Sequence, residues 1–131
     1  MIVLDTNALI WWIDNPKKLP KKVSNLIKQE KAEGAILISS ISILEIYRLF
    51  KLGKLQLRDH IDSWLEKIEE LPFVKFISVD NKIAAQSINL LDFNHQDPAD
   101  RIIIATAQRY GATLVTSDKR ILDYPQVQTI W

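Results

Sequence analysis

Short apolar segments alternate along this chain with longer amphipathic ones, and this alternation limits its fold more than any other feature. Ile2–Leu4 is short and rich in β-branched residues, and polar residues follow it at once, as expected of a buried strand that runs into a helix. We expect strands at 2–4, 35–38, 74–79, 113–116 and 127–131. We expect helices at 8–13, 21–31, 41–52, 61–71, 81–91, 98–110 and 119–122. This order predicts an α/β fold with a mostly parallel sheet and helices on both faces.

Length and composition indicate one globular domain spanning residues 1–131. The chain is 47% hydrophobic and 25% charged, without the depletion of apolar residues that marks disorder. It has no cysteine and no secretory signal pattern, so we expect a cytoplasmic protein. No apolar run approaches the roughly 20 residues that cross a bilayer, so we expect no membrane span. A net charge of +1 argues against nucleic-acid binding through a large positive field, but it permits a local patch or a metal.

All three glycines, Gly34, Gly53 and Gly111, fall where a helix should end. Each is expected to adopt the left-handed conformation that closes a helix. No glycine is then left for a phosphate-binding loop, which excludes the Walker and dinucleotide-binding motifs.

Several acids stand at the ends of expected strands or the starts of expected helices. Asp5 and Asp118 each follow a strand, and Asp97 and Asp100 begin the helix 98–110. Taken singly, each has an ordinary explanation as a helix cap or as a charge that the helix dipole favours.

Glu45 is harder to explain, because it lies inside the apolar helix 41–52. We expect the helices 41–52 and 61–71 to be largely buried or covered by a partner, and a buried unpaired carboxylate is costly. One explanation is a local ion pair with Arg48, three residues on. The interpretation that we favour is that Glu45 points into a polar cleft and meets a cation.

The topology expected of a parallel sheet can bring these acids together. Ligands in open α/β sheets bind beyond the carboxyl ends of the strands, where Asp5 and Asp118 lie. A cluster of carboxylates needs a counter-cation, and oxygen ligands favour Mg²⁺ or Mn²⁺. Such an ion activates water and stabilises the charge that develops during phosphodiester hydrolysis.

Four motifs in order resemble the PIN-domain family, and within it the VapC toxins of bacterial toxin-antitoxin pairs. They are the opening I-V-L-D-T-N-A-L-I, the S-x-x-x-x-E ending at Glu45, the H-x-D-P-x-D-R starting at His95, and the T-S-D ending at Asp118. The resemblance covers nearly the whole chain. It implies a three-layer PIN-like fold with a five-stranded parallel sheet flanked by helices, and a Mg²⁺ or Mn²⁺ site. It also implies endoribonuclease activity inhibited by a cognate antitoxin protein, and we expect a homodimer.

The resemblance also assigns roles to single residues. It makes Asp5, Glu45, Asp100 and Asp118 the catalytic and metal-binding acids. Thr6 and Ser117 become supporting hydroxyls, and Asp97 a helix cap or a supporting acid. The basic residues beside these acids, Arg101, Lys119 and Arg120, are expected to contact RNA. His95 matches its motif, and we expect it to order structure rather than to transfer a proton.

Other protein classes fit less well. A haloacid-dehalogenase-type phosphatase needs a second aspartate two residues after the first, where this chain has Asn7. A response-regulator receiver needs an acidic pair after the first strand, and only its later aspartate has a counterpart, at Asp80. A non-catalytic PIN-like module that binds RNA or protein remains the alternative function.

Overall fold

The computed structural model describes residues 1–131 and contains every strand and helix expected from the sequence, with bounds that differ by a few residues. The strands are β1 (Ile2–Leu4), β2 (Ile36–Ser39), β3 (Val74–Ile77), β4 (Thr113–Val115) and β5 (Thr129–Ile130). The helices are α1 (Thr6–Asp14), α2 (Lys21–Glu33), α3 (Ser40–Lys51), α4 (Ile61–Glu69), α5 (Asn81–Ile88), α6 (Pro98–Tyr110) and α7 (Lys119–Leu122). A short 3-10 helix, η1 (Pro16–Lys18), follows α1.

The five strands form one sheet in the order β3-β2-β1-β4-β5, and every neighbouring pair is parallel. The chain therefore builds outward from β1 to β3 on one side and then crosses to the other side of β1 for β4 and β5. This reversal places the carboxyl ends of β1 and β4 side by side, where α/β sheets bind ligands.

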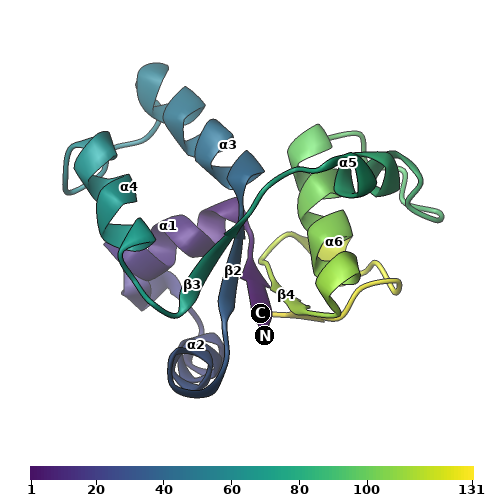
Figure 1. Ribbon diagram of the computed structural model, residues 1–131, viewed down its shortest axis with the longest axis horizontal. Helices are drawn as coiled ribbons and strands as arrows, with labels where there is room; N and C mark the ends of the chain where they lie inside the picture. The colour runs from purple at the N-terminus through teal and green to yellow at the C-terminus, as the bar shows by residue number, and fades with distance from the viewer.

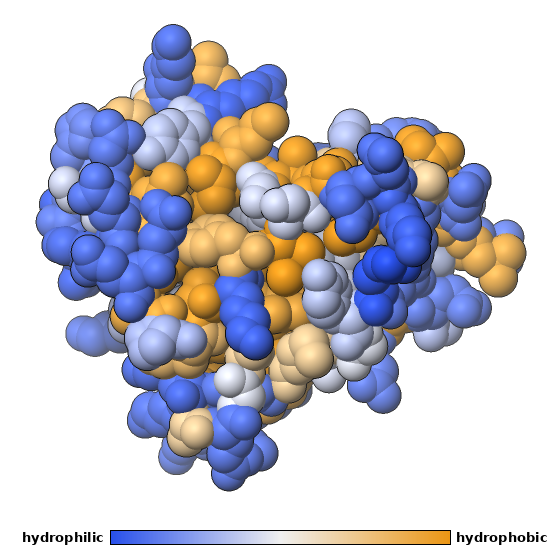
Figure 2. Space-filling model, viewed as in Figure 1, coloured by the Kyte–Doolittle hydropathy of each residue, from blue (hydrophilic) through white to orange (hydrophobic).

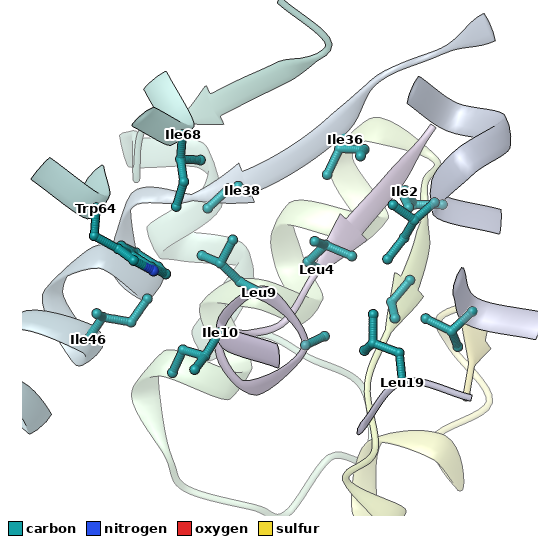
Figure 3. Close-up of a cluster of buried hydrophobic side chains, with 14 of the residues drawn as sticks. Ile2, Leu4, Leu9, Ile10, Leu19, Ile36, Ile38, Ile46, Trp64 and Ile68 are labelled. Atoms are coloured by element: carbon teal, nitrogen blue, oxygen red, sulfur yellow. The ribbon is translucent and has the colours of Figure 1, made fainter. Parts of the chain in front are cut away.

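Alternate residues of β1 face two separate cores. Ile2 and Leu4 pack into a cluster with residues from α1, α2, α3 and α4, which Figure 3 shows. Val3 points the other way, into a cluster with residues from α6 and the segments around α5 and α7. Figure 1 shows the resulting layers, with α1, α2 and α4 on one side of the sheet and α5 and α6 on the other.

The glycine prediction is right for two residues and wrong for the third. Gly53 and Gly111 have the positive φ angles of 71° and 61° that left-handed helix ends require. Gly34 has a φ of −136° and is not left-handed. A side chain there would collide with the carboxylate of Glu30, which is paired with the amino terminus at 2.8 Å. Because the contact is with the movable end of the Glu30 side chain, a Cβ at Gly34 would require only a shift of that carboxylate.

The helix around Glu45 was expected to be largely buried or covered by a partner, and within this chain only one of its faces is buried. Ile46 is fully buried against the sheet, but Leu44 is 58% exposed and Phe50 37% exposed. The helix packs one side on the core and leaves the other side without cover. In the view of Figure 2, hydrophobic residues gather between α3 and the α5–α6 pair. None of the helices has the length and hydropathy needed to span a membrane.

Candidate active site

Asp5 stands directly after β1 and caps the next helix. Its Oδ1 accepts a hydrogen bond from the backbone N–H of Ala8 at 2.8 Å, which satisfies a free donor at the start of α1. The residue is only 8% exposed. Burial, together with the nearby charges of Asp100 and Asp118, raises the pKa of Asp5 to about 6. Asp5 is thus a helix cap, as one explanation predicted. Keeping its buried carboxylate charged still costs free energy, and a bound cation would remove that cost.

Glu45 points from α3 toward the start of α1, where its Oε1 accepts a hydrogen bond from the hydroxyl of Thr6. The Thr6 oxygen lies 3.0 Å from the Ser42 hydroxyl, which is buried. A hydroxyl has one proton, so if Thr6 donates to Glu45 it must accept from Ser42. Glu45 makes no ion pair with Arg48, and burial raises its pKa. The geometry therefore favours the cleft interpretation over the local pair.

The start of α6 supplies two further carboxylates. Asp97 caps the helix by accepting hydrogen bonds from the backbone N–H groups of Ala99, at 2.9 Å, and Asp100, at 3.3 Å. The Asp100 side chain does not cap the helix. It forms a hydrogen bond with His95 instead, with 3.0 Å between Oδ2 of Asp100 and Nε2 of His95. Burial and the charge of Asp97 raise the pKa of Asp100.

Asp118 follows β4 and caps α7. Its Oδ1 accepts from the backbone N–H of Arg120 at 2.9 Å, and its Oδ2 lies 2.9 Å from the Arg120 guanidinium. The backbone N–H of Asp118 donates to the Thr116 hydroxyl at 3.0 Å, which fixes the turn after the strand. Its hydrogen bond with the Arg120 side chain lowers the pKa of Asp118, so this acid is the one whose negative charge is best compensated by the protein.

His95 connects the last two acids. Its Nδ1 lies 2.8 Å from Nη1 of Arg120, which can only donate. Nδ1 is therefore the acceptor in this contact, and Nε2 carries the proton that it donates to Asp100. The resulting chain runs from Asp118 through Arg120 and His95 to Asp100, in agreement with an ordering role for the histidine.

One cavity of about 280 Å³ collects these side chains. It lies between α3 and α6, beyond the carboxyl ends of β1 and β4 (Figure 1). The four predicted acids line it together with Asp97, Thr6, Ser117 and Arg120. Five carboxylates thus face a single guanidinium. This excess of oxygen donors and negative charge fits a divalent cation, and His95, Asp97 and Asp100 also offer ligand atoms within 4.8 Å of one another.

Comparison with known proteins shows which family the chain belongs to. The family model for the PIN domain matches residues 2–127. The chain belongs to the PIN-domain family. Ribonuclease VapC22 of Mycobacterium tuberculosis is 30% identical over 132 aligned residues, which cover 99% of this chain and 98% of that PIN relative.

Two solved structures share the fold of this chain. VapBC2 from Rickettsia felis, bound to a DNA fragment from its promoter, superposes with a TM-score of 0.74 at 24% identity, covering 100% of this chain and 99% of that one. FitAcB from Neisseria gonorrhoeae gives a TM-score of 0.68 at 21% identity, with coverages of 100% and 97%. These similarities show that the five-stranded parallel architecture expected from the PIN resemblance is correct.

The basic residues that were expected to contact RNA, because they adjoin the predicted acids, lie in three different settings. Arg120 lines the acidic cavity and is exposed. Lys119 is exposed but lies outside the lining of that cavity. Arg101 is only 7% exposed, and its guanidinium donates to the backbone carbonyls of Ser87, Ile88, Phe93 and His95. The expectation for Arg101 is therefore wrong, because four carbonyls already occupy its donors.

Two site residues were not predicted. Asn7 lines the acidic cavity, and Ser42 supports Thr6 from a fully buried position in α3. Ser42 stands three residues before Glu45, so it lies on the same side of the helix. That spacing is the only signal in the sequence that singles it out.

Proposed function

We propose that this PIN-domain protein is a metal-dependent endoribonuclease that hydrolyses RNA phosphodiester bonds in the cytoplasm as the toxin of a toxin-antitoxin pair. The observation that carries this proposal is the convergence of four carboxylates, each from a different part of the chain, in one cavity. Similarity over nearly full length to a protein named Ribonuclease VapC22 supports RNA as the substrate.

The residues that would hold the metal are Asp5, Glu45, Asp100 and Asp118. Carboxylate oxygens are the ligands that Mg²⁺ and Mn²⁺ prefer, so the donor set fits either ion. When bound, the ion would supply an activated water and would stabilise the charge on the leaving oxygen. The raised pKa values of Asp5, Glu45 and Asp100 fit this role, since a cation would restore the charged form that burial disfavours.

The surrounding residues would position the acids and the substrate. Thr6 and Ser42 hold the Glu45 carboxylate in one orientation through their hydroxyl chain. Arg120 aligns Asp118, and its exposed guanidinium can meet an RNA phosphate at the mouth of the cavity. Ser117 lines the same wall, while Lys119 would contribute only from outside the cavity.

The proposed protein partners are a cognate antitoxin and a second copy of the chain. The solved structures with the same fold are described as VapBC2 from Rickettsia felis, FitAcB from Neisseria gonorrhoeae and a toxin-antitoxin complex from Klebsiella pneumoniae. The uncovered apolar residues of α3, Leu44 and Phe50, offer a surface that a protein partner can bury.

The test is cleavage of a structured RNA by the purified protein. Product should appear with Mg²⁺ or Mn²⁺, stop when excess chelator is added, and resume when the ion is restored. If no metal-dependent cleavage occurs with either ion, the chain is a non-catalytic PIN-like binding module and the nuclease proposal fails.

A further inference from the structure

A second cavity, of about 500 Å³, shares one lining residue with the acidic cavity. Arg120 lines both cavities. Its guanidinium is held from both directions, by Asp118 at 2.9 Å and by His95 at 2.8 Å. An RNA strand that crosses the acidic cavity therefore reaches the second cavity on the other side of Arg120.

The deep wall of the second cavity is apolar and rigid. The rings of Phe93 and Tyr124 lie 4.8 Å apart, and both residues are more than nine-tenths buried. The Tyr124 hydroxyl is already bonded to the carbonyl of Leu91 at 2.8 Å. Arg101 fixes the backbone that carries Phe93 and His95 through the carbonyl contacts described above. The wall is thus formed before any ligand arrives.

The rim of the second cavity carries free polar groups. The side-chain amide of Asn94 is exposed and makes no hydrogen bond within the protein. Asp92 and Asp123 lie on the same rim and are exposed. The two carboxylates are acceptors without a proton of their own, so they can take hydrogen bonds from the N–H donors of a ligand.

This combination matches an unpaired nucleobase. Proteins bind splayed-out RNA bases by stacking them on aromatic or arginine planes and by hydrogen-bonding their edges. Here the exposed guanidinium of Arg120 supplies the flat surface, the nearly buried Phe93 and Tyr124 rings supply an apolar lining, and Asn94 with the two carboxylates supplies edge contacts. We propose that this cavity binds the base of an RNA nucleotide that neighbours the scissile phosphate, an inference that rests on the proposed ribonuclease function.

Direct binding is tested by nuclear magnetic resonance on the full chain with cytidine and adenosine as probes, and with ribose and inorganic phosphate as controls. The nucleosides should shift the side-chain amide signal of Asn94 and the Nε–H signal of Arg120, whereas ribose should shift neither signal and phosphate should leave the Asn94 signal unchanged. In the Asn94→Ala variant, the nucleosides should shift the Arg120 signal less than they do in the wild-type protein. Asn25→Ala, at an exposed position on α2, should leave that shift unchanged. Absence of nucleoside shifts, or equal shifts with ribose, would overturn the proposal.

A second test uses RNA cleavage. Four single-stranded RNAs that differ only in the nucleotide beside the cut should be cleaved at different rates, and Asn94→Ala should change the ratio of these rates about fivefold, the effect of one lost hydrogen bond. An unchanged ratio would contradict the base-binding cavity. If the wild-type protein cleaves no RNA, the proposed function fails instead, and the nucleoside titration still decides whether the cavity binds a base.

Discussion

Opposing effects act on the charge of the Asp5 carboxylate. As the cap of α1 it accepts a hydrogen bond that favours its charged form, while burial and two neighbouring acids favour the neutral form. Burial is the largest of these effects, so its pKa rises from 3.8 to about 6. Without a metal, the charge at Asp5 is therefore a cost to folding at neutral pH.

This cost predicts that Asp5→Asn stabilises the metal-free protein at pH 7. Between pH 4 and pH 6 the folded chain binds more protons than the unfolded chain, so wild-type stability falls as pH rises through that window. At pH 7 the penalty amounts to at most about 3 kcal/mol, and asparagine caps helices as well as aspartate does. Urea unfolding with chelator should show a more stable variant at pH 7 and a much smaller difference at pH 4.

Asp80→Asn is the matched control for that experiment. Asp80 caps α5 with the same geometry, accepting from the backbone N–H of Ile83 at 2.8 Å, but it is exposed. The Asp80→Asn variant should show no comparable increase in the free energy of unfolding at pH 7. Equal or lower stability of Asp5→Asn at both pH values would contradict the account of Asp5.

The sequence predicted the acidic residues of the cavity better than it predicted the basic ones. Asp5 and Asp118 were predictable because each follows a strand, and Glu45 because a carboxylate in an apolar helix needs a partner. Arg101 was misassigned because its place beside Asp100 suggested a surface contact. Its burial depends on how the segment 89–97 folds back over α6, and no local pattern in the sequence encodes that path.

At the scale of elements, Arg101 fixes the segment between α5 and α6. Its four carbonyl contacts reach the end of α5 and the connection itself, at 2.7 to 3.1 Å. The segment carries Phe93, of the second cavity, and His95, which bonds to Asp100. One buried guanidinium in the first turns of α6 thus positions parts of both cavities.

Arg101→Ala should lower the free energy of unfolding by about 3 kcal/mol, because it removes charge-assisted hydrogen bonds and leaves buried carbonyls unsatisfied. Urea unfolding provides the measurement. Arg109→Ala, at an exposed position of the same helix, should change stability by no more than about 0.5 kcal/mol. If the two variants behaved alike, the structural role of Arg101 would be wrong.

The helix α3 shows what hydrophobic periodicity does not reveal. Apolar residues surround it, which predicted that most of its sides are buried or covered by a partner, and within this chain only one side is buried. Ile46 is fully buried and Leu44, two residues earlier, is 58% exposed. A sequence pattern shows that a side chain is apolar, but it does not show whether the same chain or a partner covers it.

At the scale of the whole molecule, strand order decides where the chemistry lies. The backbone N–H of Asp5 donates to the carbonyl of Val115 at 3.1 Å, so the end of β1 is tied to the end of β4. Asp5 and Asp118 become neighbours although 113 positions separate them in the sequence. Alternating strands and helices predicted a parallel sheet, but the order of its strands depends on long-range packing that local patterns do not specify.

The central claim, that the shared carboxylate cavity cleaves RNA, is tested most directly by the cleavage rate of Asp100→Asn with Mg²⁺. Asp100 contacts His95 and lies near Asp5, Asp97 and Asp118, so neutralising it should disturb the whole cluster. The predicted result is a loss of roughly 100-fold or more, the scale of removing one preorganised charged group, while Asp80→Asn keeps the wild-type rate. Undiminished cleavage by a folded Asp100→Asn protein would contradict the claim.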